Sequence, residues 1–446
     1  MKRLLRNGLA PAVYRQKTRE WRSSRTRGRK KSDHAIVAMH HVRPLSVWPS
    51  SERALVKHGN FYLRVPRVFS FIHNPEETIA TLQELRSALE RQNLSTLYVD
   101  HRGCEVLDLC ASVVMDSLLL RAARHWWVKK QRVQLRGDLS EQKSVNDMLI
   151  ASGVPRQLKI SGDIPAEVAD KVVRMDLFQG RRSKYAAKTS SQELAATQLK
   201  EYINKCLSTE GSQLTEEGEN LLLQLVTEVL DNAEQHARTD DHWYVIAYFS
   251  RFETENGGIC HIVIFNYGDS IAQSLRSSDA EEVKEEIRAL AARHASNKLF
   301  NLPFWQEETL WTLYSLQEGV TRLAGTKAGR FRGNGTVKML EFFQDLSGST
   351  DSRMCLVSGN SFIRFDSTCR FREGKRGVHP GTWKVVAFND KNDLDLPPDK
   401  EYVHSLKHRF PGTLVSLRFP IDRSYMENRE SSHARAKDNK PRGGVD

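Results

Sequence analysis

The sequence predicts an α/β protein with two folded domains, and three observations support this fold class. The chain has 446 residues, enough for two or three domains of about 150 residues each. Apolar residues make up 39% of the chain and charged residues 27%. This balance is typical of globular proteins and excludes collagen-like and wholly disordered chains. Short strand-like runs also alternate with segments of helical periodicity.

A first domain is predicted over residues 34–165, where strands and helices alternate. Strand-like runs occupy 61–71, 95–100 and 131–137, and helical spacing extends over 76–93, 109–129 and 141–152. This order predicts βα units and a partly parallel sheet. Residues 166–195 are mixed and polar, and we expect them to be the linker between the two domains.

A second domain is predicted over residues 196–420. Helices are expected at 191–207 and 214–237, a helical and irregular stretch at 270–328, and a further helix at 336–346. Strands are expected at 243–250, 259–266, 354–358, 361–365, 383–388 and 413–419. Gly359 and Asn360, between two of these runs, indicate a hairpin turn. The second domain is therefore predicted to be an α/β sandwich, with a mixed sheet backed by helices.

The net charge of +12 comes mainly from one end of the chain. Residues 1–33 hold twelve Lys and Arg residues against two acidic residues, whereas residues 34–420 are close to neutral. We expect 1–33 to be a disordered basic arm and 421–446 to be a flexible polar tail. The arm could contact nucleic acid, could contact an acidic partner, or could simply be solvated.

The cysteines and the apolar runs bear on localisation. Six cysteines are scattered along the chain without a CxxC pair or zinc-type spacing, and we expect them to be buried thiols of a cytoplasmic protein. No apolar run approaches the ~18 residues of a membrane-spanning helix. The Arg-rich N-terminus also lacks the apolar segment of a secretory signal. We therefore expect no membrane contact.

The helix over 219–237 carries an unusual polar stripe. Glu228, Asn232 and His236 are spaced four residues apart, so they lie on one side of the helix, among leucines. An Asn carbonyl can coordinate Mg²⁺ and a Glu carboxylate can accept a proton. The helix alone leaves a second interpretation open, in which these side chains face solvent.

Three further segments contain features of a ligand site. Asn266-Tyr267-Gly268 ends an apolar strand, and a polar side chain there can hydrogen-bond to the edge of a base. Glycines at 329, 333 and 335 precede a helix, whose backbone N–H groups can bind phosphate. Gly412-Thr413 begins the final strand with a hydroxyl group. Taken singly, each pattern is more often a plain turn.

In this order the segments resemble the Bergerat-fold ATP-binding domain of the GHKL family, which includes gyrase B, histidine kinases and MutL. The resemblance covers about residues 196–420. It rests on Glu228-Val-Leu-Asp-Asn232-Ala233, Asn266-x-Gly268, Gly333-x-Gly335-Thr336 and Gly412-Thr413. With His236, the first of these boxes is most similar to the anti-sigma-factor serine kinases.

The resemblance implies a site for ATP and Mg²⁺. Asn232 would bind the nucleotide's Mg²⁺, Glu228 would be the catalytic base, and Asn266 lies where the family's adenine-reading Asp is expected. The other implied nucleotide-binding residues are Gly268, Gly329, Gly333, Gly335, Thr336 and Thr413. Two positions depart from the family pattern, because Asn266 replaces an Asp and Ser270 replaces a Gly. An amide can still accept the adenine N6–H, with weaker selectivity.

The region between the boxes, about 272–332, is long for a lid. It contains Phe304, Trp305 and Trp311. We expect these aromatic residues to form the core of the lid, and the alternative is a partner surface.

The first domain resembles a STAS domain in its order of strands and helices. Asp108-Leu109-Cys110-Ala111 aligns with the turn that carries the phosphoacceptor serine of that fold, and here the serine is missing. Ser112 is the nearest hydroxyl. The resemblance implies an interaction module that is not phosphorylated at the usual point. A generic α/β domain is the alternative.

We therefore predict a Mg-ATP-binding regulatory or signalling protein, and slow ATP hydrolysis is compatible with this prediction. Its nucleotide state would control a regulatory protein partner, bound through the N-terminal domain or the lid. Three alternatives stay open: an anti-sigma-type serine/threonine protein kinase, a nucleic-acid-associated GHKL ATPase that uses the basic arm, and an adaptor whose nucleotide site has decayed. The sequence does not decide between ATPase and kinase, and a homodimer is compatible with it.

Overall fold

The computed structural model describes most of the chain between Trp48 and Ile421. The described residues are 48–51, 54–153, 166–181, 190–209, 211, 213–236, 242–251, 257–294, 305–320, 337, 340–341, 343, 352–369, 371–374 and 383–421. The predicted basic arm and almost all of the predicted polar tail lie outside these residues. So does the glycine turn at 329–335.

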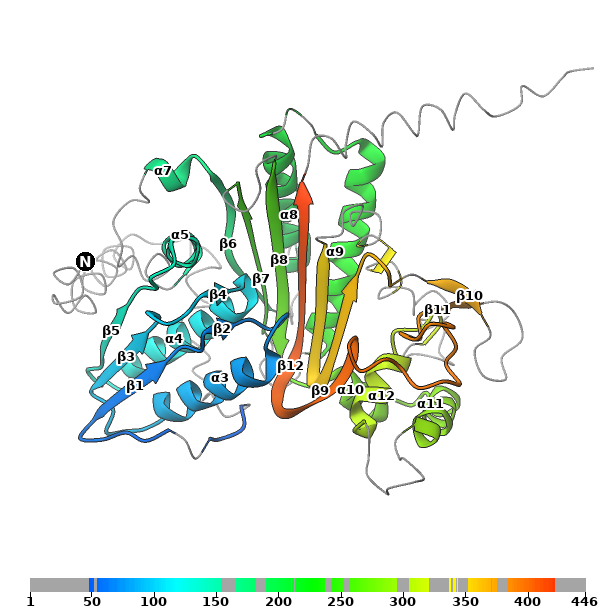
Figure 1. The fold of residues 1–446 in the computed structure, drawn as a ribbon, viewed down its shortest axis with the longest axis horizontal. Coiled ribbons are helices and arrows are strands. Elements are labelled where there is room, and N and C mark those ends of the chain that lie inside the picture. The colour runs from blue at the N-terminus through cyan, green and yellow to red at the C-terminus, as the bar shows by residue number, and fades with distance from the viewer. Residues whose placement is uncertain are drawn as a thin grey trace, which may run out of the picture.

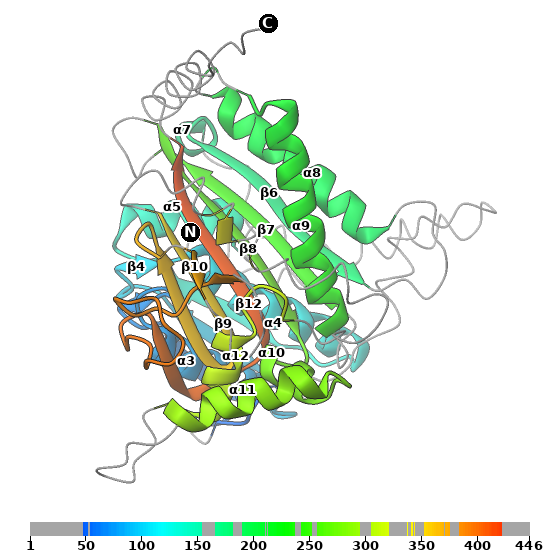
Figure 2. The same ribbon diagram turned by 90° about the vertical axis from the view of Figure 1, so that its right-hand side faces the viewer.

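The described chain forms alternating layers of sheet and helix (Figure 1). A small parallel sheet is followed by helices α3 and α4, then by a five-stranded sheet, and then by a second layer that contains α8 and α9. Figure 2 shows α8 and α9 lying across the outer face of the large sheet. The protein is therefore of the α/β class, as the sequence predicts.

The N-terminal half alternates strands and helices as predicted. Its elements are β1 (Asn60–Arg64), β2 (Val68–Phe69), α3 (Pro75–Leu89), β3 (Thr96–Asp100), β4 (Val106–Leu107), α4 (Leu109–Val128), β5 (Gln134–Asp138) and α5 (Lys143–Ser152). The three longer strands pair in parallel in the order β1-β3-β5, and β2 pairs in parallel with β4.

Helix α4 is buried on nearly every side along its first three turns, because it lies between the two sheets. This position explains its continuous apolar sequence. Its N-cap is Asp108, whose carboxylate accepts a hydrogen bond from the Ala111 N–H at 2.7 Å. Ser112, the hydroxyl nearest to the predicted turn, is 1% exposed inside this helix, so no enzyme could reach it in the folded protein.

The C-terminal half consists of one sheet with helices. Its elements are α7 (Ala166–Ala169), β6 (Val172–Arg181), α8 (Ser191–Ser208), α9 (Glu216–His236), β7 (His242–Ser250), β8 (Gly258–Tyr267), α10 (Ile271–Arg276), α11 (Glu281–His294), α12 (Glu307–Tyr314), β9 (Arg353–Asp366), β10 (Arg372–Gly374), β11 (Trp383–Val385) and β12 (Val403–Ile421). The five-stranded sheet has the order β6-β7-β8-β12-β9, and β10 pairs with β11.

Each pair of neighbouring strands in the large sheet is antiparallel, so the expectation of mixed strand direction is wrong. The pair α8 and α9 explains one of these directions. Two antiparallel helices cross the sheet twice, so β7 starts at the end of the sheet where β6 finished. Strand β6 and helix α7 lie within 166–195, the segment that we expected to be a linker.

The hairpin predicted at Gly359-Asn360 is also wrong, because β9 runs through both residues as one strand. Gly359 has a positive φ of 60°, a conformation that glycine adopts without strain. A Cβ atom at this position would lie 2.0 Å from the Glu308 carboxylate. The glycine therefore makes room for a side chain of α12 instead of reversing the chain.

Both faces of the large sheet are buried, and the two faces use alternate residues. Ile262 and Ile264 of β8 pack against the α8 and α9 layer, whereas Val263 and Phe265 pack against the N-terminal half. Every residue of β7 and β8 is consequently buried, which explains why apolar residues predominate in both strands.

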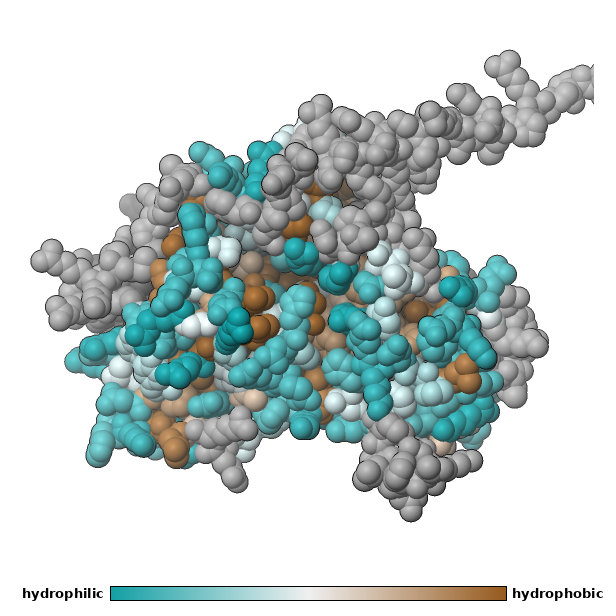
Figure 3. All heavy atoms as spheres, in the orientation of Figure 1, coloured by the Kyte–Doolittle hydropathy of each residue, from teal (hydrophilic) through white to brown (hydrophobic). Residues whose placement is uncertain are grey.

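The cysteines and the surface can be compared with the sequence-based expectations. Five of the six cysteines are buried, Cys369 is half-buried, and all six are free thiols. Within the described ranges, no helix is long and apolar enough to cross a membrane. On the face of the molecule drawn in Figure 3, hydrophilic residues predominate and apolar atoms form small patches.

Strands β8 and β12 approach each other very closely where Gly412 lies. This glycine has a φ of +147°, and a Cβ atom on it would lie 2.0 Å from the Asn266 carbonyl oxygen. We expect Gly412→Ala to destabilise the fold by at least about 1 kcal/mol. Gly103→Ala is the matched control, because no heavy atom lies within 4 Å of its Cβ position. Equal midpoints of thermal unfolding for the two variants would contradict this close approach.

Candidate functional site

A row of polar side chains crosses one end of the large sheet. Strand pairing places Asn266 of β8 directly opposite Thr413 of β12, and Thr413 directly opposite Ser358 of β9. On its other side, Asn266 lies opposite Trp243 of β7. Residues directly opposite each other share a face of the sheet. The strand alternation turns this face towards the layer of α8 and α9.

The next row inward on the same face is entirely apolar. It consists of Val245, Ile264, Val415 and Leu356, which face one another across four strands. The polar row therefore lies where the hydrophobic core ends. A polar ligand could bind at this edge without entering the core.

Asn266 is the most unusual member of the polar row. It is 1% exposed, and its Nδ2 group has no hydrogen-bond partner among the described residues. An unsatisfied buried polar group costs about 1–3 kcal/mol. A ligand that accepts a hydrogen bond from this amide would remove the penalty.

The last turns of helix α9 lie at the same end of the sheet. The Trp243 indole N–H donates a hydrogen bond to the Glu234 carboxylate at 3.2 Å, and Trp243 is the neighbour of Asn266. Asn232, two residues before Glu234, is half-buried. The structure thus brings α9, with Asn232, to the end of the sheet that holds Asn266. The side chains of Glu228 and His236 lie outside the described part of α9.

The predicted residues at the strand ends are brought together. The Gly268 N–H donates to the Pro411 carbonyl at 3.1 Å, so the end of β8 lies beside the segment that leads to Thr413. Asn266, Gly268 and Thr413, which are 147 positions apart at their extremes, therefore form one locus.

The predicted phosphate-binding residues Gly329, Gly333, Gly335 and Thr336 lie outside the described residues. The described positions that follow them are helical, and Val337, Leu340 and Phe343 among them are buried. Leu340 and Phe343 belong to the same core as α8 and α9.

Two aromatic residues of the predicted lid lie in the hydrophobic core and not on the surface. Trp305 and Trp311 are 6% and 1% exposed and join the core of the C-terminal half, as we preferred from the sequence. Phe304 lies outside the described residues. Ser270, which departs from the family pattern, is the N-cap of α10 and forms a capping box with Gln273.

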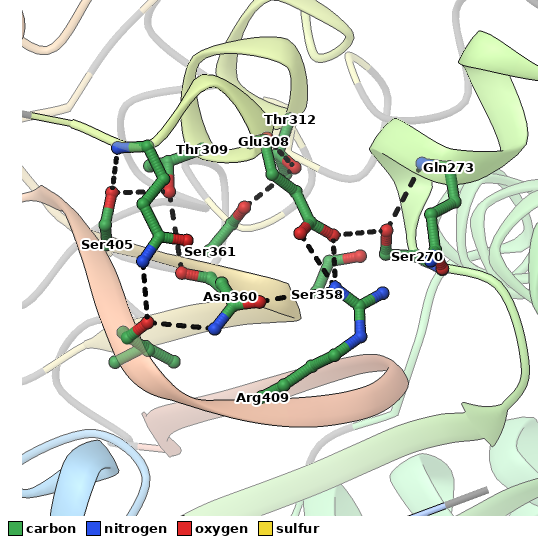
Figure 4. A network of polar contacts seen from close by, with 12 residues as sticks. Ser270, Gln273, Glu308, Thr309, Thr312, Ser358, Asn360, Ser361, Ser405 and Arg409 are labelled. Carbon is green, nitrogen blue, oxygen red and sulfur yellow. Dashed lines mark hydrogen bonds and ion pairs between the residues drawn. The ribbon is translucent and has the colours of Figure 1, made fainter. Parts of the chain in front are cut away.

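A polar network connects the row to the predicted lid, and Figure 4 shows its part around Ser270, Glu308 and Arg409. The Ser358 hydroxyl bonds to the Thr413 hydroxyl at 2.8 Å and accepts the first N–H of α10, from Ile271, at 2.9 Å. The Ser270 hydroxyl donates to the Glu308 carboxylate of α12 at 2.6 Å. Glu308 in turn accepts from Arg409 of β12 at 2.7 and 2.9 Å.

The same network reaches the N-terminal half. The backbone carbonyl of Arg409 accepts from the side-chain amide of Gln83 at 3.0 Å. The backbone N–H groups of Lys407 and His408 donate to the Glu76 carboxylate at 2.8 and 3.4 Å. Gln83 and Glu76 are both on α3. Hydrogen bonds therefore extend from α3, through Arg409 and Glu308, to the helix that starts beside Asn266.

Sequence reasoning missed Trp243, Ser358, Glu308 and Arg409. The available signal for Ser358 was a hydroxyl group directly after four apolar residues. The glycine that follows Ser358 indicated a turn instead. Glu308 and Arg409 are about one hundred residues apart, and neither belongs to a local motif. Within the described ranges, no cluster of three or more His, Cys, Asp or Glu side chains could hold a metal ion.

Arg409 neutralises the Glu308 carboxylate, whose side chain is only 14% exposed. We expect Arg409→Met to destabilise the protein by about 2 kcal/mol, because a buried charged acceptor loses its donor. The control is Arg293→Met, which breaks an ion pair with Asp395 that is 54% and 67% exposed. That change should alter the free energy of unfolding by less than about 1 kcal/mol. Similar losses for both variants, measured by thermal unfolding, would argue against a special role for Arg409.

Comparisons with known proteins give no support beyond the geometry of the site. No family model, no curated protein and no solved structure matched the chain. The chemistry of the polar row and its surroundings therefore carries the functional argument.

Proposed function

We propose that the polar row and the end of α9 form a site for ATP with Mg²⁺, in a domain of the GHKL type, and that the protein is a nucleotide-dependent regulatory protein. The observation that carries this proposal is the buried, unpartnered amide of Asn266 beside the Thr413 hydroxyl. By the sequence resemblance, Asn266 would read the adenine base, and Thr413 would contact the nucleotide through its hydroxyl.

The chemistry of Asn266 suits a purine base. Its side chain offers one acceptor and two N–H donors. The oxygen can accept the N6–H of adenine, while an N–H can donate to a ring nitrogen. Thr413 adds a half-buried hydroxyl in the adjacent strand. The apolar row next to them, which includes Ile264 and Val415, would pack against the flat faces of a base.

Asn232 suits the metal that accompanies the phosphates. Mg²⁺ keeps several waters and takes few protein ligands besides phosphate oxygens, so a single amide oxygen is sufficient. The ion would supply charge neutralisation for the phosphates. Glu228, one helical turn before Asn232 in the sequence of α9, would accept a proton from water. Backbone N–H groups of the glycine turn at 329–335 would contact the phosphates.

The network in Figure 4 offers a route for regulation. A nucleotide that contacts Thr413 would also act on Ser358 and on the start of α10. From there, Ser270, Glu308 and Arg409 lead to α3. A site that binds nucleotide more tightly in one arrangement of this network shifts the population towards it. The N-terminal half would then present a different surface to a regulatory partner.

Asn266→Leu should lower the affinity for ATP without lowering the stability of the fold. The variant removes the unpartnered amide at similar volume, so the midpoint of thermal unfolding should stay the same or rise. Binding of fluorescently labelled ATP in the presence of Mg²⁺ should fall by at least about tenfold, since two hydrogen bonds to the base are lost. Asn232→Ala should instead weaken the dependence of binding on Mg²⁺.

The matched control for a lost hydroxyl is a pair of threonine variants. Thr413→Val removes the hydroxyl of the polar row, whereas Thr81→Val removes a hydroxyl on α3 that bonds to the Glu77 carbonyl. Only Thr413→Val should lower the affinity for ATP. Wild-type protein that binds no nucleotide, or Asn266→Leu that binds as well as wild type, would refute the proposal.

Transmission to α3 can be measured separately from binding. In the wild type, ATP with Mg²⁺ should change the hydrogen-exchange protection of peptides that cover residues 75–89. Glu308→Gln should leave nucleotide affinity within about twofold and reduce this change, because a neutral side chain binds Arg409 more weakly. If α3 responds equally in both proteins, the signal does not pass through Glu308.

A further inference from the structure

The small parallel sheet leaves one face open. Phe61, Leu63 and Leu97 project from the covered face into the core with α3 and α4. No described element covers the opposite face, although parallel sheets are usually covered on both sides. The residues of the open face are Asn60, Tyr62 and Arg64 of β1, Thr96, Tyr98 and Asp100 of β3, and Gln134, Arg136 and Asp138 of β5.

Two tyrosines form a rigid aromatic pair at the centre of this open face. Tyr62 and Tyr98 lie opposite each other in neighbouring strands, with ring centroids 5.1 Å apart and planes 11° apart. The Tyr62 hydroxyl donates to Asp100 and the Tyr98 hydroxyl donates to Asp138. The bond to Asp138 raises the pKa of Tyr98 to about 12, so this phenol stays protonated at neutral pH. A ligand that stacks on Tyr62, which is 46% exposed, meets a side chain that is already fixed in place.

The open face carries more positive than negative charge. Its two carboxylates are already occupied, because Arg102 donates to Asp100 at 2.7 and 2.9 Å and forms an ion pair with Asp138 at 3.5 Å. Arg64 and Arg136 are exposed, and neither forms an ion pair with a carboxylate in the described part of the chain. Arg136 continues the row of Tyr62 and Tyr98 on the third strand. The face therefore presents a pair of aromatic rings together with three arginines and two aspartates.

We propose that this face binds single-stranded nucleic acid, with a base stacked on Tyr62 and backbone phosphates contacted by Arg64 and Arg136. Aromatic side chains on a positively charged surface bind single strands because every base has a flat face and every nucleotide has a phosphate. Double-stranded nucleic acid offers phosphates but keeps its base faces stacked inside. The proposal is independent of the ATP site.

The charge of residues 1–33 fits the same ligand. This segment holds twelve Lys and Arg residues and two acidic residues, so its sign is the same as that of the open face. A polyanion is attracted to positive charge of both kinds. The segment would add affinity without sequence preference, and the sheet face would add preference for single strands.

The test uses the full chain and fluorescently labelled oligonucleotides of about 12 nucleotides, a length within the usual site size. Anisotropy titrations compare single-stranded RNA, single-stranded DNA and duplex DNA. Tyr62→Ala should weaken single-strand binding by about tenfold, while Tyr62→Phe, which keeps the ring and loses the bond to Asp100, should bind within about twofold of wild type. If the hydroxyl and not the ring were required, both variants would lose binding to the same extent, because both lack the hydroxyl.

The charge contribution is tested with a matched pair of arginines. Arg136→Ala should reduce the slope of log affinity against log salt by about one. Arg372→Ala, which removes an exposed arginine on β10, should leave the slope unchanged. If Tyr62→Ala lowers the midpoint of thermal unfolding, the binding result of Arg136→Ala is used instead. This exposed side chain bonds only to Gln134 within the described ranges, so we expect its loss to leave the fold intact.

Three results would overturn the proposal. The first is wild-type protein that binds none of the single strands. The second is equal affinity for duplex and single strands. The third is unchanged single-strand binding in both Tyr62→Ala and Arg136→Ala, which would assign all binding to residues 1–33.

Discussion

Both halves of the protein depend on the burial of both faces of one antiparallel sheet. Because side chains alternate along β8, Phe265 and Tyr267 pack against the N-terminal half while Asn266 between them faces the α9 layer. The sheet is thus the floor of the candidate nucleotide site and also the surface on which α3 and α4 rest. A rearrangement at the end of β8 or β12 acts on both layers, which gives a physical reason to expect communication between the halves.

The polar row lowers the stability of the fold at one position. Asn266 occupies a position that an apolar residue would fill at lower free energy, and its amide lacks a partner in the described chain. Strained or unsatisfied groups are found at functional sites because the surrounding fold over-determines them. Here, the neighbours that hold Asn266 in place are Trp243, anchored to Glu234 of α9, and Thr413, anchored to Ser358. These residues define the site geometrically even where side chains such as Glu228 are not described.

Local patterns predicted much of the fold, and long-range pairing accounts for the rest. Helices such as α8 and α4, and buried strands such as β7, followed from periodicity and apolar runs. Gly359 failed as a turn because its positive φ serves a contact with Glu308, about fifty residues away, which no local pattern contains. The antiparallel direction of β6 and β7 depends on how α8 and α9 pair. Among the candidate site residues, Asn266 and Thr413 were predicted from their motifs, whereas Ser358 became a candidate only through the strand register that places it beside Thr413.

The most direct test of the central claim is a crystal structure of the protein with Mg²⁺ and a non-hydrolysable ATP analogue. We expect electron density for the base against the side chains of Asn266 and Thr413, and for the metal ion next to the oxygen of Asn232. A nucleotide bound elsewhere, or a polar row that remains free of ligand at saturating analogue while Asn266 bonds to another part of the chain, would contradict the assignment of this end of the sheet as the nucleotide site.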